Sequence, residues 1–306
     1  IYSRGHAAGL SLLSPFFIVA YGWLAGKPIA MLPQTIGPLW RGWERVLVRW
    51  LLDRIEVISL RDLTSVELMQ RMGVPASRYH LTPDIAFLYA GADRRFAQAL
   101  LGHYGVNLEQ TRPLLGVTLI NWGAQHPQFK GQAHYEAAVA AAIRHFVQTY
   151  HGQALLFAQV CGPTPADDDR IPARRVHAML SAAGLNGSVT VVDEEVPAGT
   201  LKAAYGAMDL LLGSRLHSNI FTLSEGTPVL AIAYQDKTFG VLRMLHLGEW
   251  VRSIEAVQAD ELVRLLDQLW SRRTEVRQQL AVRIPILQKE AQQSVALIRA
   301  AVGRKS

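Results

Sequence analysis

The sequence predicts an α/β protein with two domains, each built around a parallel sheet. Short apolar runs of strand length alternate with longer segments of helical spacing, a pattern typical of parallel sheets. Half of the 306 residues are hydrophobic, enough to fill the interior of such sheets. The alternation breaks at residues 90–113, which look like a connector, and then restarts. We therefore expect an N-terminal domain at 1–110 and a C-terminal domain at 111–306, in keeping with about 150 residues per domain.

The first expected element is a helix at residues 12–25. It lies in an uncharged segment, 7–26, whose length resembles a membrane span of about 20 residues. Glycine, serine and proline interrupt this segment, and a strand-like run follows at 29–32. A buried helix that leads into a buried strand fits better than a membrane helix, since helices that are apolar all round occur in large cores.

The remaining elements follow from apolar spacing and capping residues. In the helix at 42–52, Val46, Leu47 and Trp50 have helical spacing, and Asp62 can cap the helix that ends at Gly73. The other expected strands are 57–60, 79–81, 114–119, 154–159, 189–192, 210–212 and 228–233, and the other expected helices are 133–150, 170–183, 201–207, 218–224 and those after residue 260.

Charged and titratable residues gather where two of these strands end. Ser214, Arg215 and His217 follow the strand at 210–212, and Tyr234 and Lys237 follow the strand at 228–233. Ligands of parallel α/β sheets bind at the carboxyl ends of the strands. Two permanent cations and one imidazole therefore predict an anionic substrate and a proton transfer. Each residue alone also fits a structural role, as a turn cap, a packed ring or a surface charge.

The composition narrows the class of partner. The net charge is +6, from 31 basic and 25 acidic residues, and the basic residues are spread out. We expect no nucleic acid, which needs a clustered basic face with aromatics. The excess suits a phosphorylated or carboxylated ligand, or anionic lipid headgroups in a peripheral membrane association. A single cysteine, Cys161, excludes an intramolecular disulfide and agrees with a cytoplasmic protein, and the histidines lack metal-ligand spacing, so we expect no metal.

Five motifs, taken in order, resemble the polysaccharide pyruvyl transferase family over nearly the whole chain. They are Pro33-Gln34-Thr35-Ile36-Gly37-Pro38, Ser59-Leu60-Arg61-Asp62 with Ser65, Thr82-Pro83-Asp84, Gly213-Ser214-Arg215-Leu216-His217 and Tyr234-Gln235-Asp236-Lys237. Cys161-Gly162-Pro163 with Asp168-Asp169-Arg170 resembles the branch that serves bacterial exopolysaccharides such as colanic acid.

The resemblance implies two Rossmann-like domains in a GT-B-like arrangement. It implies transfer of pyruvate from phosphoenolpyruvate to two hydroxyls of a sugar, which forms a cyclic ketal and releases phosphate without a cofactor. The acceptor is then a sugar of an exopolysaccharide or of its lipid-linked precursor, met in the cytoplasm or at the inner face of the plasma membrane. Family members carry an upstream strand and glycine-rich loop that this sequence does not show, so we expect a partial N-terminal, acceptor-side domain.

The residues allow roles to be assigned within this chemistry. Arg61, Arg215 and Lys237 can bind carboxylate and phosphate, and His217 can protonate the enol methylene. The substrate-binding set is completed by Ser214, Gln34, Asp84, Asp168, Asp169 and Tyr234. For four of them a structural role stays open: a turn for Gln34, orientation of Arg61 for Asp84, and a solvated helix start for the aspartates at 168 and 169.

Two other functions remain open at this point. One is a GT-B glycosyltransferase with a nucleotide sugar, for which Glu225 is the candidate partner of the ribose hydroxyls. The other is a non-catalytic member of a polysaccharide assembly complex. The fold alone does not separate the three.

Overall fold

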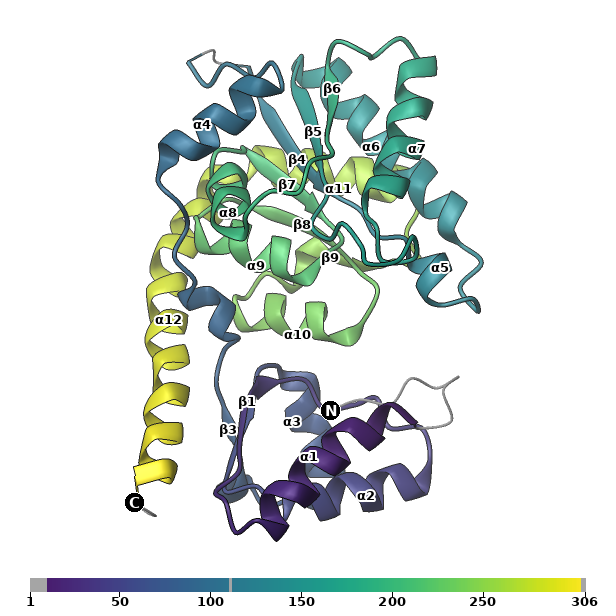
Figure 1. Cartoon of the computed structure of the whole chain (residues 1–306). Helices are drawn as coiled ribbons and strands as arrows, with labels where there is room; N and C mark the ends of the chain where they lie inside the picture. Colours follow the sequence, from purple (N-terminus) through teal and green to yellow (C-terminus); the bar gives the residue numbers. More distant parts are fainter. Residues whose placement is uncertain (1–9, 110–111, 304–306) are drawn as a thin grey trace. The chain divides into compact units, whose positions relative to one another are not determined.

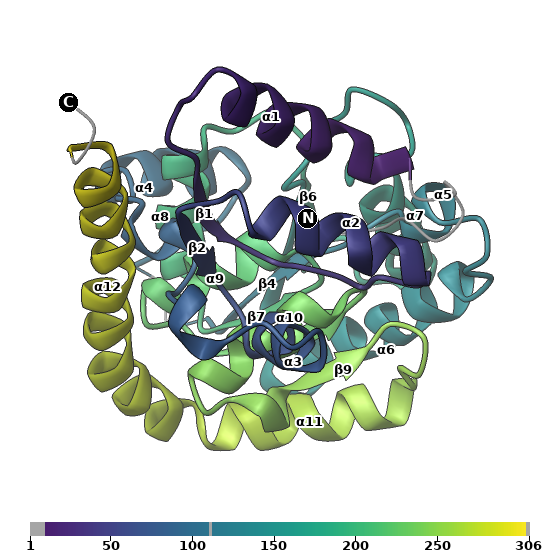
Figure 2. The ribbon, with the colours of Figure 1, turned by 90° about the horizontal axis from the view of Figure 1, so that it is seen from below.

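The structure, a computed structural model, describes residues 10–109 and 112–303, and these form two compact units. The first unit takes in the described residues of 1–88 and 285–306, and the second is 89–284. Both units are parallel α/β, which confirms the predicted fold class (Figure 1). The last helix, α12 (Arg273–Gly303), follows α11 (Ala259–Ser271) directly (Figure 2). The boundary between the two units falls within α12, at Pro285.

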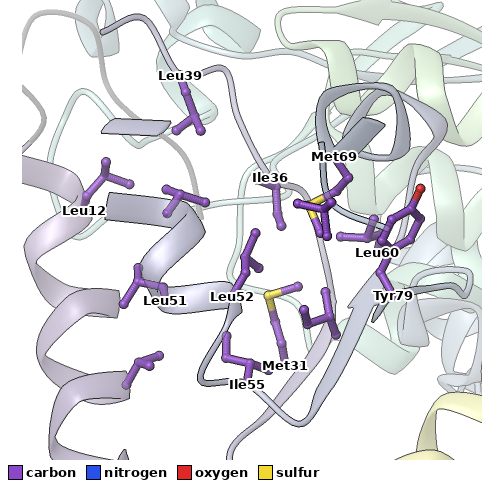
Figure 3. Packing of buried hydrophobic residues seen from close by; sticks show 14 residues of the cluster. Leu12, Met31, Ile36, Leu39, Leu51, Leu52, Ile55, Leu60, Met69 and Tyr79 are labelled. Carbon is purple, nitrogen blue, oxygen red and sulfur yellow. The ribbon is translucent and has the colours of Figure 1, made fainter. Parts of the chain in front are cut away.

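The first unit has a three-stranded parallel sheet in the order β1-β2-β3. The strands are β1 (Ala30–Gln34), β2 (Val57–Leu60) and β3 (His80–Leu81), and the helices are α1 (Leu13–Leu24), α2 (Gly42–Leu52) and α3 (Leu63–Arg71), with 3-10 turns at Leu10–Leu12, Ala76–Arg78 and Ile85–Leu88. Buried side chains of the sheet and helices share one core, which includes Met31 of β1, Leu51 of α2 and Leu60 of β2 (Figure 3). Asp62 caps α3 as predicted, because its carboxylate accepts from the backbone N–H of Ser65.

Two helices of the first unit differ from a simple picture of apolar residues inside and charged residues outside. Within α1 Val19 is buried, but Phe17, Ile18 and Tyr21 are exposed, so this helix is not buried all round. In α2 the apolar Val46 is exposed, whereas the charged Glu44 is buried. The Glu44 carboxylate accepts from the backbone N–H groups of residues 40 and 41, so capping of the helix draws a charged side chain inward.

The second unit has a six-stranded parallel sheet in the order β6-β5-β4-β7-β8-β9. The strands are β4 (Leu114–Thr118), β5 (Gln153–Phe157), β6 (Val189–Val192), β7 (Leu210–Gly213), β8 (Val229–Ala233) and β9 (Val251–Ser253), and the helices are α4 (Arg94–His103), α5 (Trp122–Gln125), α6 (Gln132–Tyr150), α7 (Arg170–Ala182), α8 (Ala198–Gly206), α9 (Leu216–Ser224), α10 (Asp236–Met244) and α11, with a 3-10 turn at Gly248–Trp250. Numbered within the unit, this is the 3-2-1-4-5-6 order of the Rossmann fold.

Local signals had missed several elements of the second unit. Residues 94–103 form helix α4 instead of a connector, since Asp93 caps it and Ala97, Leu100 and Leu101 are buried along one face. The short strand β9 and the helix α10 were not expected, and α9 begins at Leu216 instead of Ser218. Among residues 10–109 and 112–303, no helix is both long and apolar enough to cross a membrane.

Candidate active site

The second unit contains the switch point at which a Rossmann sheet binds its ligand. Strand β4 comes first in this unit and has β5 on one side and β7 on the other. Because the chain builds outward from β4 in both directions, the connections diverge at the carboxyl ends of β4 and β7, which is where sheets of this order bind their ligands. Ser214 and Arg215 follow β7 at this point, and Asn121 and Trp122 follow β4.

Arg215 is held at the switch point by a buried carboxylate. Its Nε donates to both oxygens of Asp169, at 3.1 and 3.0 Å, and its Nη2 donates to Oδ1 at 2.6 Å. The Asp169 side chain is 0% exposed and that of Arg215 is 12% exposed. Such a bidentate contact sets both the position and the plane of the guanidinium.

Burial and charge act against each other in this pair. Burial raises the pKa of the Asp169 carboxyl to about 6, although the charge and hydrogen bonds of Arg215 act to lower it. Burial also acts to lower the pKa of Arg215, but Asp169 outweighs it and keeps that pKa above its ordinary value. Arg215 therefore remains a cation, and its partner titrates much closer to neutral pH than a surface aspartate does.

Tyr234 connects Arg215 to two further residues at this end of the sheet. Arg215 hydrogen-bonds the Tyr234 side chain, and the Lys237 ammonium lies 5.4 Å from the centroid of the Tyr234 ring. The Trp122 ring lies 4.8 Å from Tyr234 and is also stacked on His126. Residues that follow β4, β5, β7 and β8 thus form one cluster. It contains the cations Arg215 and Lys237 and the aromatic rings of Trp122 and Tyr234.

A network of hydroxyl groups lies beneath this cluster. The buried Tyr135 hydroxyl on α6 is 2.6 Å from Ser214 Oγ, and it accepts from the backbone N–H of Ile120. Thr118, the last residue of β4, contacts the hydroxyl of Ser218 at 2.8 Å and the backbone N–H of Ser214. Ser214 is 1% exposed, and its hydroxyl contacts that of Tyr135 inside the protein. Burial raises the pKa of Tyr135, which keeps its hydroxyl protonated.

The tight turn after β7 explains the glycine in the motif. A Cβ built on Gly213 would lie 1.8 Å from Asn219 Oδ1, and the Asn219 amide donates to the Gly213 carbonyl at 3.3 Å. Only glycine permits this approach. This spacing of glycine and asparagine is a signal in the sequence, whereas nothing local in the sequence identified Tyr135 or Thr118.

His217 and Asp168 differ from Asp169 in their exposure. The His217 side chain is exposed in the first turn of α9, two residues after Arg215. Asp168 forms a bidentate pair with Arg170, with Nη2 to Oδ2 at 2.7 Å, and hydrogen bonds from Arg170 lower its pKa. Asp168 and Asp169 are adjacent in the sequence but pair with different arginines, so they cannot share one role.

The first unit holds a separate cluster around Arg61. Its Nη1 donates to Asp84 Oδ2 at 2.5 Å, and its Nε donates to Thr35 Oγ1 at 3.0 Å. Thr35 in turn donates to Asp62, and the backbone carbonyl of Gln34 accepts from the Arg61 N–H. Asp84 therefore orients Arg61, which is the structural role that the sequence left open for it.

Glu225 does not lie where a ribose would need it. It follows the last residue of α9, so it lies at the opposite end of that helix from Arg215. Its carboxylate is 3.4 Å from the buried ammonium of Lys202, which also donates to the Tyr89 carbonyl. Among the residues that the structure describes, no group of three or more His, Cys, Asp or Glu side chains is placed to hold a metal ion.

Comparison with known proteins gives one family and one shared fold. A family model described as polysaccharide pyruvyl transferase matches residues 6–236. The chain is 24% identical over 275 residues to the amylovoran biosynthesis protein AmsJ of Erwinia amylovora, a match that covers 84% of this chain and 61% of that protein. The chain thus spans less than two thirds of the length of this relative.

Solved structures with little sequence identity share the architecture. The S. aureus protein MnaA, in a co-structure with UDP, has a TM-score of 0.63 at 10% identity, with 93% of this chain and 72% of that chain covered. HepE of Anabaena, in complex with UDP and glucose, has a TM-score of 0.52 at 14% identity, with 99% and 76% covered. At such identities the likeness shows the fold alone, which is GT-B-like.

Proposed function

The chain belongs to the polysaccharide pyruvyl transferase family, and from this premise we propose that it transfers pyruvate from phosphoenolpyruvate to a sugar of a bacterial polysaccharide. The product is a cyclic ketal on two sugar hydroxyls, and inorganic phosphate is released. The family match carries the proposal. The cations at the switch point of the second unit support it, because phosphoenolpyruvate bears both a carboxylate and a phosphate.

In the proposed first step, His217 donates a proton to the methylene carbon of the enol. The neighbouring carbon, which bears carboxylate and phosphate, becomes electrophilic, and the first sugar hydroxyl adds to it. The proton of that hydroxyl returns to the imidazole, which is then ready for another cycle. Exposure of His217 in the first turn of α9 supports this role, since a general acid must reach its substrate.

In the second step, the bond between that carbon and the phosphate oxygen breaks, and the phosphate leaves with the bonding pair. Arg215 and Lys237 stabilise the charge that develops on the leaving oxygen. The second sugar hydroxyl then closes the ketal, and its proton leaves with the phosphate. In this proposal Arg215 and Lys237 of the second unit meet the donor's charges without a cofactor, and a role for Arg61 of the first unit stays a prediction.

The acceptor belongs to the same proposal. AmsJ is named for amylovoran biosynthesis, which supports a polysaccharide as the acceptor class, and the proposal includes its lipid-linked precursor as an alternative acceptor. A lipid-linked precursor would bring the reaction to the inner face of the plasma membrane. Gln34 and Tyr234 are proposed substrate contacts, since both are partly exposed near the ends of parallel strands.

Phosphate release tests the function. The protein is mixed with phosphoenolpyruvate alone, and with added bacterial polysaccharide or lipid-linked oligosaccharide, and inorganic phosphate is measured. We expect release that depends on the acceptor, together with a mass gain of one pyruvyl ketal on the acceptor. Stabilisation by UDP but not by phosphoenolpyruvate would instead favour a glycosyltransferase, although Glu225 is not available to a ribose at the switch point. A full-length chain that responds to neither would indicate a non-catalytic role.

A further inference from the structure

The carboxylate of Asp169 is fully engaged inside the protein. It receives three hydrogen bonds from Arg215 and a fourth, at 3.0 Å, from the backbone N–H of Val160. An ionised carboxylate offers about four acceptor sites, so these contacts use its capacity. With no exposed surface as well, the Asp169 carboxylate has no face open to a sugar hydroxyl in this structure.

Asp169 is itself held rigidly. Its backbone N–H donates to the Val160 carbonyl at 2.9 Å, and its own carbonyl accepts from Ala173 in the first turn of α7. Next to it, Asp168 forms a β-bridge with Cys161, which closes the segment between β5 and α7 onto itself. The carboxylate thus projects from an anchored backbone.

The pair of Asp169 and Arg215 crosses the switch point. Asp169 lies in the segment that follows β5, whereas Arg215 follows β7, and β4 lies between these two strands. The two side chains therefore meet over the carboxyl end of β4, the place where a Rossmann sheet binds its ligand. A contact at this position can orient a binding group without touching the ligand.

We infer that Asp169 is a positioning residue, which holds the guanidinium of Arg215 in the orientation that binds the donor anion. The inference rests on the proposed function, because the anion in question is phosphoenolpyruvate. The Arg215 side chain has several rotatable bonds, and its bidentate contact with Asp169 fixes them before the ligand arrives. Without Asp169 the charge of Arg215 persists, but its plane and position are no longer set.

The test compares the affinity for phosphoenolpyruvate by titration calorimetry. In Asp169→Asn, which keeps the size of the side chain, we expect affinity to fall roughly tenfold or more, as misplaced binding groups do. Asp193→Asn is the matched control. Asp193 follows β6 of the same sheet and pairs with Arg174 at 2.8 Å, but this pair is exposed, and β5 and β4 separate β6 from β7, so we expect unchanged affinity.

A second pair of variants separates orientation from general destabilisation. Arg215→Lys keeps a positive charge but cannot make the bidentate contact, so the orientation is already lost. Adding Asp169→Asn to Arg215→Lys should then change the affinity less than about twofold, since contacting residues that act as a unit are not additive. A further tenfold loss in the double variant would overturn the inference, because Asp169 would then act independently of Arg215.

The remaining outcomes are also decisive. Wild-type protein that does not bind phosphoenolpyruvate contradicts the proposed function itself. Wild-type binding with Asp169→Asn within twofold of it overturns the positioning role and leaves the function intact. An equal loss in Asp193→Asn overturns it as well. If thermal melting shows that Asp169→Asn is unfolded, Asp169→Glu is measured instead: a loss of affinity supports the inference and unchanged affinity overturns it.

Discussion

Each unit carries an arginine that follows a parallel strand and pairs with a buried aspartate, but the two pairs are built differently. Arg61 follows β2, and its partner Asp84 follows β3, the adjacent strand. Arg215 follows β7, and its partner Asp169 comes from the segment after β5, two strands away. The exposed fractions are similar, at 16% and 5% in the first pair and 12% and 0% in the second.

The difference lies in how each guanidinium is held. Arg61 divides its donors between the Asp84 carboxylate and the Thr35 hydroxyl, whereas Arg215 places Nε and Nη2 on one carboxylate. Bidentate contact fixes the plane of a guanidinium, and divided contacts hold it through a network that survives the loss of one member. Similar burial therefore does not mean similar dependence on the partner aspartate.

The largest effect is expected from Arg215→Ala. Because it leaves Asp169 buried without its partner, the free energy of unfolding should fall by about 3–5 kcal/mol. Affinity for phosphoenolpyruvate should fall roughly a hundredfold or more, since a desolvated charged contact is lost. Denaturant unfolding and calorimetry measure the two effects. Arg170→Ala, which breaks the more exposed pair with Asp168, should lower the free energy of unfolding far less, and equal losses in both variants would contradict this account.

His217→Ala tests whether the second unit also supplies the proton. Removal of a general acid typically costs about 10²–10⁴ in rate, so kcat should fall below a tenth of the wild-type value. The affinity for phosphoenolpyruvate should change much less, because the cations remain. Steady-state kinetics separate the two. His103→Ala, an exposed histidine on α4, serves as the control. Turnover above a tenth of wild type would remove His217 as the donor.

The raised pKa of Asp169 predicts that the stability of the folded protein depends on pH. Burial raises this pKa from 3.8 to about 6, so between these values the folded state holds a proton that the unfolded state has released. The stability of the wild type relative to Asp169→Asn should therefore fall as pH rises from about 4 to 6, by the order of 2–3 kcal/mol, and stay level above 6. Denaturant unfolding across this range measures it. A rise instead would mean that Arg215 outweighs burial.

The smallest effect is expected from Asp84→Asn. Thr35 still accepts from Arg61, so the free energy of unfolding should fall by only about 1–2 kcal/mol. Affinity for phosphoenolpyruvate should fall less than in Asp169→Asn, and calorimetry on both variants makes the comparison. Equal losses of affinity would mean that divided and bidentate contacts make an arginine equally dependent on its partner aspartate.

Strong local patterns allowed most elements to be predicted. The strands at 57–60 and 189–192 and the helix at 42–52 have the expected bounds, because each is a distinct apolar or amphipathic run. Helix α4 was missed because its polar residues and flanking glycine and proline resemble a loop, although three apolar residues share one face. For α1 the structure shows which side chains are exposed, since composition alone does not say which face of an apolar helix is covered.

Part of the candidate site was also visible in the sequence. Arg215, Tyr234 and Lys237 could be placed together because each follows a strand, and parallel strands of one sheet end at one edge. Tyr135 and Asp169 could not be assigned their roles. Their contacts join residues 79 and 46 positions apart, and no local spacing encodes such a pairing.

Taken by itself, the order of apolar runs and motifs determined the α/β class, the family and the strand ends that carry charge, because these depend on residues near one another in the chain. The tertiary structure alone decided which aspartate of the adjacent pair is buried against Arg215 and which pairs with Arg170. That choice depends on β5 and β7 flanking β4, which brings two distant loops over one strand end.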